Sequence, residues 1–126
     1  MNDDILARYH ANRLRVVRQV RYSLANENSI DLVLFLNGLP VATAELKTDF
    51  TQGIQDAVDQ YRFDRSPTPK GKPSEPLLGF PGGALVHFAV SDSEVMMTTK
   101  LDGPGTRFLP FNKGDDGGKG NPLNPK

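Results

Sequence analysis

The chain of 126 residues has no cysteine, no net charge and no long apolar run. Without cysteine it can form neither a disulfide nor a thiolate zinc site, which fits a reducing cytoplasm. A net charge of zero removes the overall basic signature of nucleic-acid-binding proteins, so any DNA contact depends on local clusters. No run approaches the 18 apolar residues of a membrane span, and the start, with Asp3 and Asp4, does not resemble a signal peptide. We expect one small domain without a membrane segment.

Two common kinds of reactive site are also missing. The chain has no cysteine nucleophile and no Ser-His-Asp arrangement. The segment Gly114–Gly120 superficially suggests a phosphate loop, but Gly118-Lys119 is followed by glycine instead of Ser or Thr, and Lys113 takes the place of the first glycine. We therefore exclude nucleotide binding at this segment.

The stretch Ile30–Lys47 predicts a β-hairpin that turns at Asn37-Gly38, because both turn residues tolerate positive φ. Its otherwise apolar strands carry three charged residues: Asp31, Glu45 and Lys47. Burying these charges costs free energy unless they bind a metal or pair with one another. The hairpin is therefore the first candidate for a functional site.

The face on which the charges lie depends on the turn. A two-residue loop would pair Leu36 with Leu39 and put Asp31 and Glu45 on opposite faces. An odd-numbered loop, or one bulge, would put both carboxylates on the face of Lys47. We favour the odd register, for which Gly38 in the left-handed conformation can supply a three-residue loop. Pairing of Leu36 with Leu39 would contradict this choice. The opposite face would then be apolar and would pack a helix, through Leu32, Leu34, Leu36, Ala42, Ala44 and Leu46.

The rest of the chain predicts an α/β fold in which helices flank a mixed sheet, with the order ββ(β)αββ. The expected elements are a helix capped by Asn2 that ends near His10, a strand Leu14–Tyr22, a helix capped by Asp49 or Thr51 that ends near Phe63, a proline-rich loop Ser66–Gly83, and strands Ala84–Val90 and Glu94–Leu101. We expect a core over residues 1–101 and a Gly/Pro-rich tail over residues 102–126.

Other candidate residues each have two interpretations. Five basic residues could contact DNA: Arg15, Arg18, Arg21, Lys70 and Lys72. Basic residues on an edge strand also simply prevent aggregation. Gln60 beside the helical stripe is either catalytic or a surface glutamine. His87, in an apolar strand, is expected to be a hydrogen-bonded core histidine and not a ligand.

Aspartate and glutamate on adjacent strands suit Mg²⁺, and a lysine on the same face can orient water or stabilise developing charge. Asp31, Glu45 and Lys47 are thus the minimum for metal-dependent phosphodiester hydrolysis. A structural ion pair between Lys47 and Glu45 is the alternative.

Four spans resemble the nuclease region of the restriction subunit of type I restriction-modification enzymes, which belongs to the PD-(D/E)xK nuclease superfamily. They are SIDLVLFLNGLPVATAELK (Ser29–Lys47), DAVDQYRFDR (Asp56–Arg65), LVHFAVSDSEVMMTTKL (Leu85–Leu101) and RFLPFNKGDDGGKGNP (Arg107–Pro122). The resemblance implies that Asp31, Glu45 and the Leu46 carbonyl ligate Mg²⁺, for which Mn²⁺ can substitute, and that Lys47 is catalytic. The family's helix carries a glutamine in a Q-x-x-x-Y pattern. Here Gln60 is followed four residues later by Asp64, and Tyr61 is adjacent instead.

The resemblance also implies partners and a setting. These are double-stranded DNA, the modification (methyltransferase) and specificity subunits, and the cytoplasm of a prokaryote. In the enzymes that the chain resembles, the restriction subunit continues into an ATP-driven DNA translocase. DNA is cut at non-specific sites after this translocase stalls. This chain has no motor motif, so we expect a fragment. Two alternatives remain: another nuclease of the superfamily, of the repair or resolvase type, and a non-catalytic module that binds DNA or partner subunits.

Overall fold

The computed structural model describes residues 2–50 and 53–112, so the Gly114–Gly120 segment and Thr51 lie outside the described residues. Its fold is α/β, with a six-stranded sheet in the order β1-β2-β3-β4-β5-β6 and few helices. The elements are α1 (Asp3–Ala11), β1 (Leu14–Arg21), β2 (Ser29–Leu36), β3 (Leu39–Leu46), α2 (Ile54–Asp59), η1 (Gln60–Asp64), η2 (Pro76–Leu78), β4 (Val86–Val90), β5 (Val95–Thr98) and β6 (Leu109–Pro110).

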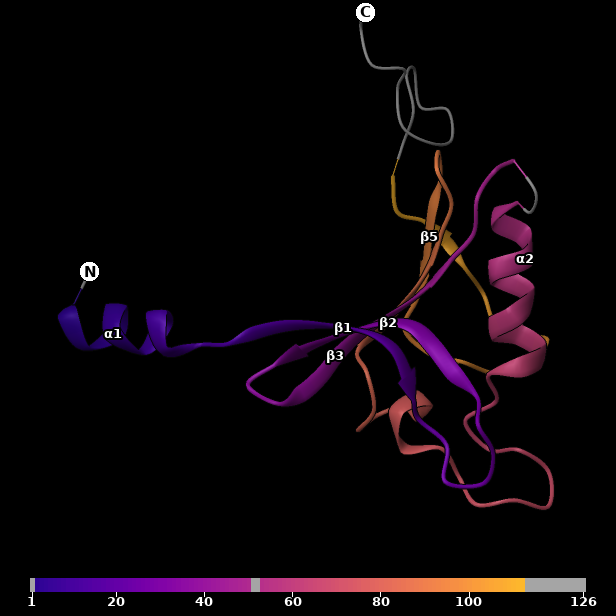
Figure 1. Ribbon diagram of the computed structural model, residues 1–126, viewed down its shortest axis with the longest axis horizontal. Helices are drawn as coiled ribbons and strands as arrows, with labels where there is room; N and C mark the ends of the chain where they lie inside the picture. Colours follow the sequence, from indigo (N-terminus) through magenta and orange to yellow (C-terminus); the bar gives the residue numbers. More distant parts are fainter. Residues whose placement is uncertain (1, 51–52, 113–126) are drawn as a thin grey trace, which may run out of the picture.

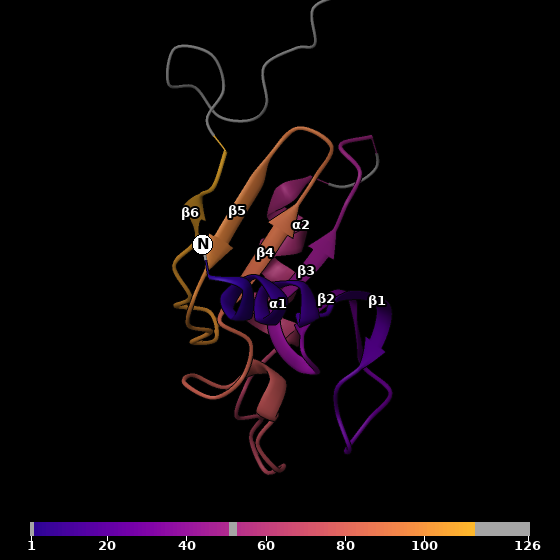
Figure 2. The ribbon, with the colours of Figure 1, turned by 90° about the vertical axis from the view of Figure 1, so that its left-hand side faces the viewer.

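The sheet is mixed, as predicted. Neighbouring strands are antiparallel except β3 and β4, which are parallel and joined by the crossover that contains α2. Figure 2 shows the six strands side by side, with α2 behind the sheet. The crossover places α2 against β4 and β5 and brings η1 next to Thr43 on β3.

The two α-helices relate differently to the sheet. Figure 1 shows α2 packed on one side of the sheet, whereas α1 extends away on the other side, before the beginning of β1. α1 has no buried residue, and the Asn2 side chain caps it by accepting a hydrogen bond from the Asp4 amide at 2.7 Å. Of the predicted flanking helices, only α2 thus covers the sheet. No helix in the described part of the chain is long and apolar enough to cross a membrane.

The helix after the hairpin begins later than predicted. Its N-cap is Gly53, whose amide donates to the Asp56 carboxylate at 2.9 Å. Asp49 is not the cap, because its carboxylate accepts from the Ser93 hydroxyl at 2.6 Å. At Gln60 the α-helix passes into the π-helical turn η1, and the predicted apolar stripe through Tyr61 faces the core.

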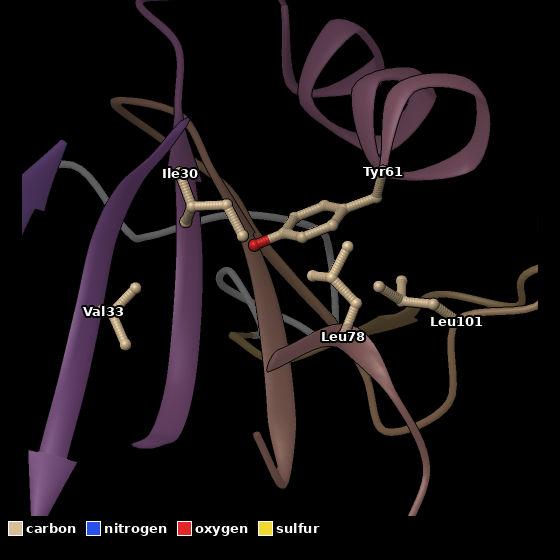
Figure 3. Close-up of a cluster of buried hydrophobic side chains, with 5 residues drawn as sticks. All are labelled: Ile30, Val33, Tyr61, Leu78 and Leu101. Atoms are coloured by element: carbon tan, nitrogen blue, oxygen red, sulfur yellow. The ribbon is translucent and has the colours of Figure 1, made fainter. Parts of the chain in front are cut away.

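The core forms where η1, η2 and the sheet meet (Figure 3). Its main cluster consists of Ile30, Val33, Tyr61, Leu78 and Leu101. Leu78 belongs to η2, a short helix inside the segment that was predicted to be a loop. The proline-rich connection folds back onto the sheet there, and the Leu78 side chain is buried as a result. Past the predicted boundary at residue 101, Phe108 packs against this cluster and β6 pairs with β5.

Candidate functional site

A bulge in the hairpin of β2 and β3 decides which side chains share a face. The turn at Asn37-Gly38 has φ values of 52° and 82° and is a two-residue loop, since Leu36 pairs with Leu39. The predicted three-residue loop is therefore wrong. The register then shifts by one residue between Leu34 and Phe35, so that Leu34 pairs with Ala42 and Leu32 with Ala44.

Continued by one residue beyond the Leu32–Ala44 pair, this register sets Asp31 opposite Glu45. Both carboxylates then lie on the same face as Thr43, because side chains alternate along a strand. The predicted shared face of Asp31 and Glu45 is confirmed, through one bulge on β3 and not through an odd-numbered loop.

The helix packs on the face that carries the carboxylates. The Tyr61 hydroxyl lies 2.8 Å from the Thr43 hydroxyl, and Arg65, directly after η1, bonds to Glu45. The prediction that the helix packs on the opposite, leucine-rich face is thus wrong. Small side chains such as Ala89, next to Glu45 on β4, leave room for α2 on the carboxylate side. The carboxylate face of the sheet is therefore covered by α2, η1 and Arg65.

Asp31 and Glu45 differ in their surroundings. Asp31 is half-buried, and its two oxygens accept from the Leu46 amide at 2.8 Å and from the Gln19 side chain at 3.1 Å. Glu45 is fully buried, and its Oε1 accepts from Arg65 Nε at 2.9 Å. Its Oε2 is buried with no hydrogen-bond partner among the described residues. A buried carboxylate oxygen without a donor is costly, so this atom is the best candidate for contact with a cation.

Burial raises the pKa of Glu45 from 4.5 to about 7. The neighbouring Arg65 opposes this rise by Coulomb attraction and its hydrogen bond, while Asp31 adds to it. Burial disfavours the charged form of a carboxyl group, and a second carboxylate nearby acts in the same direction. The pair thus has the electrostatic character of a site that binds a positive charge.

Lys47 and Gln60 line a common hollow, whose lining includes neither Asp31 nor Glu45. This cavity of about 330 Å³ is lined by Lys47, Asp56, Asp59, Gln60, Phe63 and Asp64. Lys47 directly follows the end of β3, and its backbone amide donates to the Val90 carbonyl of β4 at 2.8 Å. This bond fixes the backbone of Lys47 next to β4. The Gln60 side-chain oxygen is buried and has no hydrogen-bond partner in the described part of the chain.

The predicted alternative of a Lys47–Glu45 ion pair is not found within residues 2–50 and 53–112, where Glu45 pairs with Arg65 instead. Those residues also include no group of three or more His, Cys, Asp or Glu side chains arranged to hold a metal. A cation at this place would have the two carboxylates and backbone oxygens as ligands, and the ligand role of the Leu46 carbonyl stays a prediction.

His87 is a core residue, as predicted. It pairs with Thr43 in the parallel ladder, and its Nδ1 lies 2.6 Å from the Thr43 hydroxyl. Burial lowers the pKa of His87 from 6.5 to about 4, so the ring is neutral at pH 7. With the Tyr61 hydroxyl on the same Thr43 oxygen, this buried polar network anchors η1 to β3 and β4.

Arg65 is the site residue that the sequence analysis missed. The spacing of the helical stripe could have identified Arg65, because Arg65 follows Tyr61 by four residues and so continues the buried side of the helix. A charged residue at such a position indicates a buried partner, here Glu45.

The five predicted DNA-contacting basic residues are all exposed but form no single face. Arg15 and Arg18, three residues apart on the edge strand β1, point to opposite faces of the sheet. Arg21 lies 3.6 Å from Glu27 in an exposed ion pair. Lys70 and Lys72 lie on the loop before η2, and DNA contact by any of the five stays a prediction.

Among known proteins, no curated protein and no solved structure matches this sequence significantly. One family model, described as the type I restriction enzyme R protein N terminus, matches residues 6–106, which is most of the chain and includes every residue of the site described above. The chain therefore belongs to the family of type I restriction enzyme R protein N-terminal regions.

Proposed function

We propose that this chain is a Mg²⁺-dependent endonuclease domain with a PD-(D/E)xK-type core that hydrolyses phosphodiester bonds of double-stranded DNA. The observation that supports this most is the pair formed by Asp31 and Glu45, in which Glu45 Oε2 is buried without a donor. Membership of a restriction-enzyme family makes phosphodiester hydrolysis the natural use of such a pair.

The residues present fit a Mg²⁺ ion, with Mn²⁺ as a substitute. Asp31, Glu45 and the Leu46 carbonyl would hold it, since hard oxygen donors are the ligands that Mg²⁺ prefers. When bound, the ion supplies a positive charge that acidifies water and offsets the charge of the phosphodiester.

The chain's own side chains would do the remaining work. Lys47 follows Glu45 by two residues, so by strand alternation its ammonium would lie on the face of the two carboxylates. There it could orient the attacking water or stabilise negative charge that develops on the phosphate oxygens. The buried Gln60 oxygen can accept a hydrogen bond from a water in the hollow that it shares with Lys47. We accordingly assign the catalytic roles to Asp31, Glu45, Lys47 and Gln60.

In the intact enzyme this domain would act together with a modification (methyltransferase) subunit and a specificity subunit. ATP-driven translocation by other parts of the R protein would precede non-specific cleavage. A nuclease of the repair or resolvase type is the alternative within the superfamily, and the family match favours the restriction enzyme.

One observation favours a non-catalytic scaffold that binds DNA or partner subunits. The Arg65–Glu45 pair at 2.9 Å gives the buried glutamate a partner without any metal. The pair accounts for Oε1 only and explains neither the unpartnered Oε2 nor Asp31 opposite it. We therefore place the scaffold second.

A calorimetric titration with Mn²⁺ separates the two functions without requiring cleavage. Wild type is compared with Asp31→Ala and with the matched control Asp92→Ala, since each substitution removes a carboxylate that accepts one backbone amide, from Leu46 and Asp49 respectively. Binding that is lost only in Asp31→Ala supports the nuclease. If folded wild type binds no Mn²⁺, alone or with a short DNA duplex, the scaffold becomes the better assignment.

A further inference from the structure

We propose that Arg65 is a positioning residue that orients Asp31 and Glu45 for cation binding. This inference rests on the proposed function, because it deepens the account of the same site. The Arg65 side chain contacts the Glu45 carboxylate and the backbone of β2, the strand that carries Asp31, and is not itself a ligand.

The Arg65 guanidinium is held from four directions. It is 7% exposed, and its Nε donates to Glu45 Oε1 at 2.9 Å. One terminal nitrogen donates to the Ser29 carbonyl at 2.9 Å and the other to the Asp64 carbonyl at 3.4 Å. The Tyr22 ring lies 5.7 Å from the guanidinium carbon. A planar group with so many contacts has little freedom to move.

These contacts join the two strands that carry the carboxylates. Ser29 precedes Asp31 by two residues on β2, so the guanidinium links the backbone of β2 to the Glu45 side chain on β3. The bond to Oε1 fixes the rotation of the Glu45 carboxylate and leaves Oε2 free. Ligating carboxylates are commonly oriented by such outer hydrogen bonds, whose loss weakens metal binding.

Lysine should replace Arg65 poorly. An ammonium retains the positive charge beside Glu45, but it is a compact group without the rigid fork of a guanidinium. It cannot keep the geometry of the bonds to both Glu45 and Ser29. Arg65→Lys therefore separates a role in orientation from a role as a mere counter-charge.

The test measures Mn²⁺ affinity by calorimetry for the full chain, Arg65→Lys and the matched control Arg62→Lys. Arg62 also donates its Nε to a carbonyl, that of Thr106 at 3.1 Å, and lies 5.9 Å from the Phe108 ring, yet it touches neither carboxylate. We expect Mn²⁺ binding to weaken on the order of tenfold in Arg65→Lys and to stay unchanged in Arg62→Lys. Circular dichroism checks that each protein is folded.

Affinity in folded Arg65→Lys equal to that of wild type would overturn the inference and leave the proposed function intact. Tighter binding would also overturn it, since the guanidinium would then be competing with the cation. Absence of Mn²⁺ binding by folded wild type would refute the metal site and, with it, the inference. If Arg65→Lys does not fold, Tyr22→Leu tests the same point by removing the ring beside the guanidinium. A loss of Mn²⁺ affinity smaller than tenfold supports the positioning role of Arg65, and an unchanged affinity refutes it.

Discussion

Two buried ionisable side chains, Glu45 and His87, are expected to change the stability in opposite directions as the pH rises. Burial raises the pKa of Glu45 from 4.5 to about 7 and lowers that of His87 from 6.5 to about 4. At 1.36 kcal/mol for each pKa unit, either change corresponds to about 3 kcal/mol of unfolding free energy.

The direction follows from which state binds the proton more tightly. Folded Glu45 holds its proton more tightly than the unfolded chain does, so its contribution is full below pH 4.5 and is lost as the pH rises to about 7. Folded His87 resists protonation, so its contribution is full above pH 6.5 and is lost as the pH falls to about 4. Between these limits the two effects nearly cancel in the wild-type protein.

Removing one group should reveal the other. Urea unfolding from about pH 4 to about pH 8 gives the free energy of unfolding for wild type, Glu45→Gln and His87→Gln. Relative to wild type, Glu45→Gln should gain up to about 3 kcal/mol of stability as the pH rises through this range, and His87→Gln should lose a similar amount. His10→Gln is the matched control, because His10 is exposed on α1. Profiles that run parallel for all four proteins would refute the reasoning.

Further predictions concern cleavage and packing. In the intact restriction enzyme, Asp31→Ala and Lys47→Ala should each abolish DNA cleavage while the fold persists. Unfolding of Lys47→Ala would instead indicate a structural role for this lysine. Circular dichroism distinguishes loss of activity from loss of folding. Tyr61→Phe removes the buried hydroxyl that lies 2.8 Å from Thr43 and should lower the unfolding free energy by about 1 kcal/mol in urea, an expectation that an unchanged midpoint would contradict. Gly38→Ala forces a side chain to adopt a φ of 82° and should cost about 1 kcal/mol in the same assay, whereas an equally stable variant would show that the turn relaxes.

Local patterns were sufficient for most of the elements. The Asn37-Gly38 turn, the Asn2 cap of α1 and the buried stripe through Tyr61 depend on residues close together in the chain. The errors concern long-range effects. The bulge between β2 and β3 and the burial of Leu78 depend on how distant segments pack, which turn and loop preferences do not specify.

The sequence by itself determined the hairpin, the identity of its three charged residues and the family to which the chain belongs, because these follow from short-range order and residue type. Only the tertiary structure decided that Glu45 is fully buried beneath the helix, pairs with Arg65 twenty residues later and keeps one oxygen without a partner. The parallel crossover brings that arginine to β3, and the loss of water there is what raises the pKa of the carboxyl group.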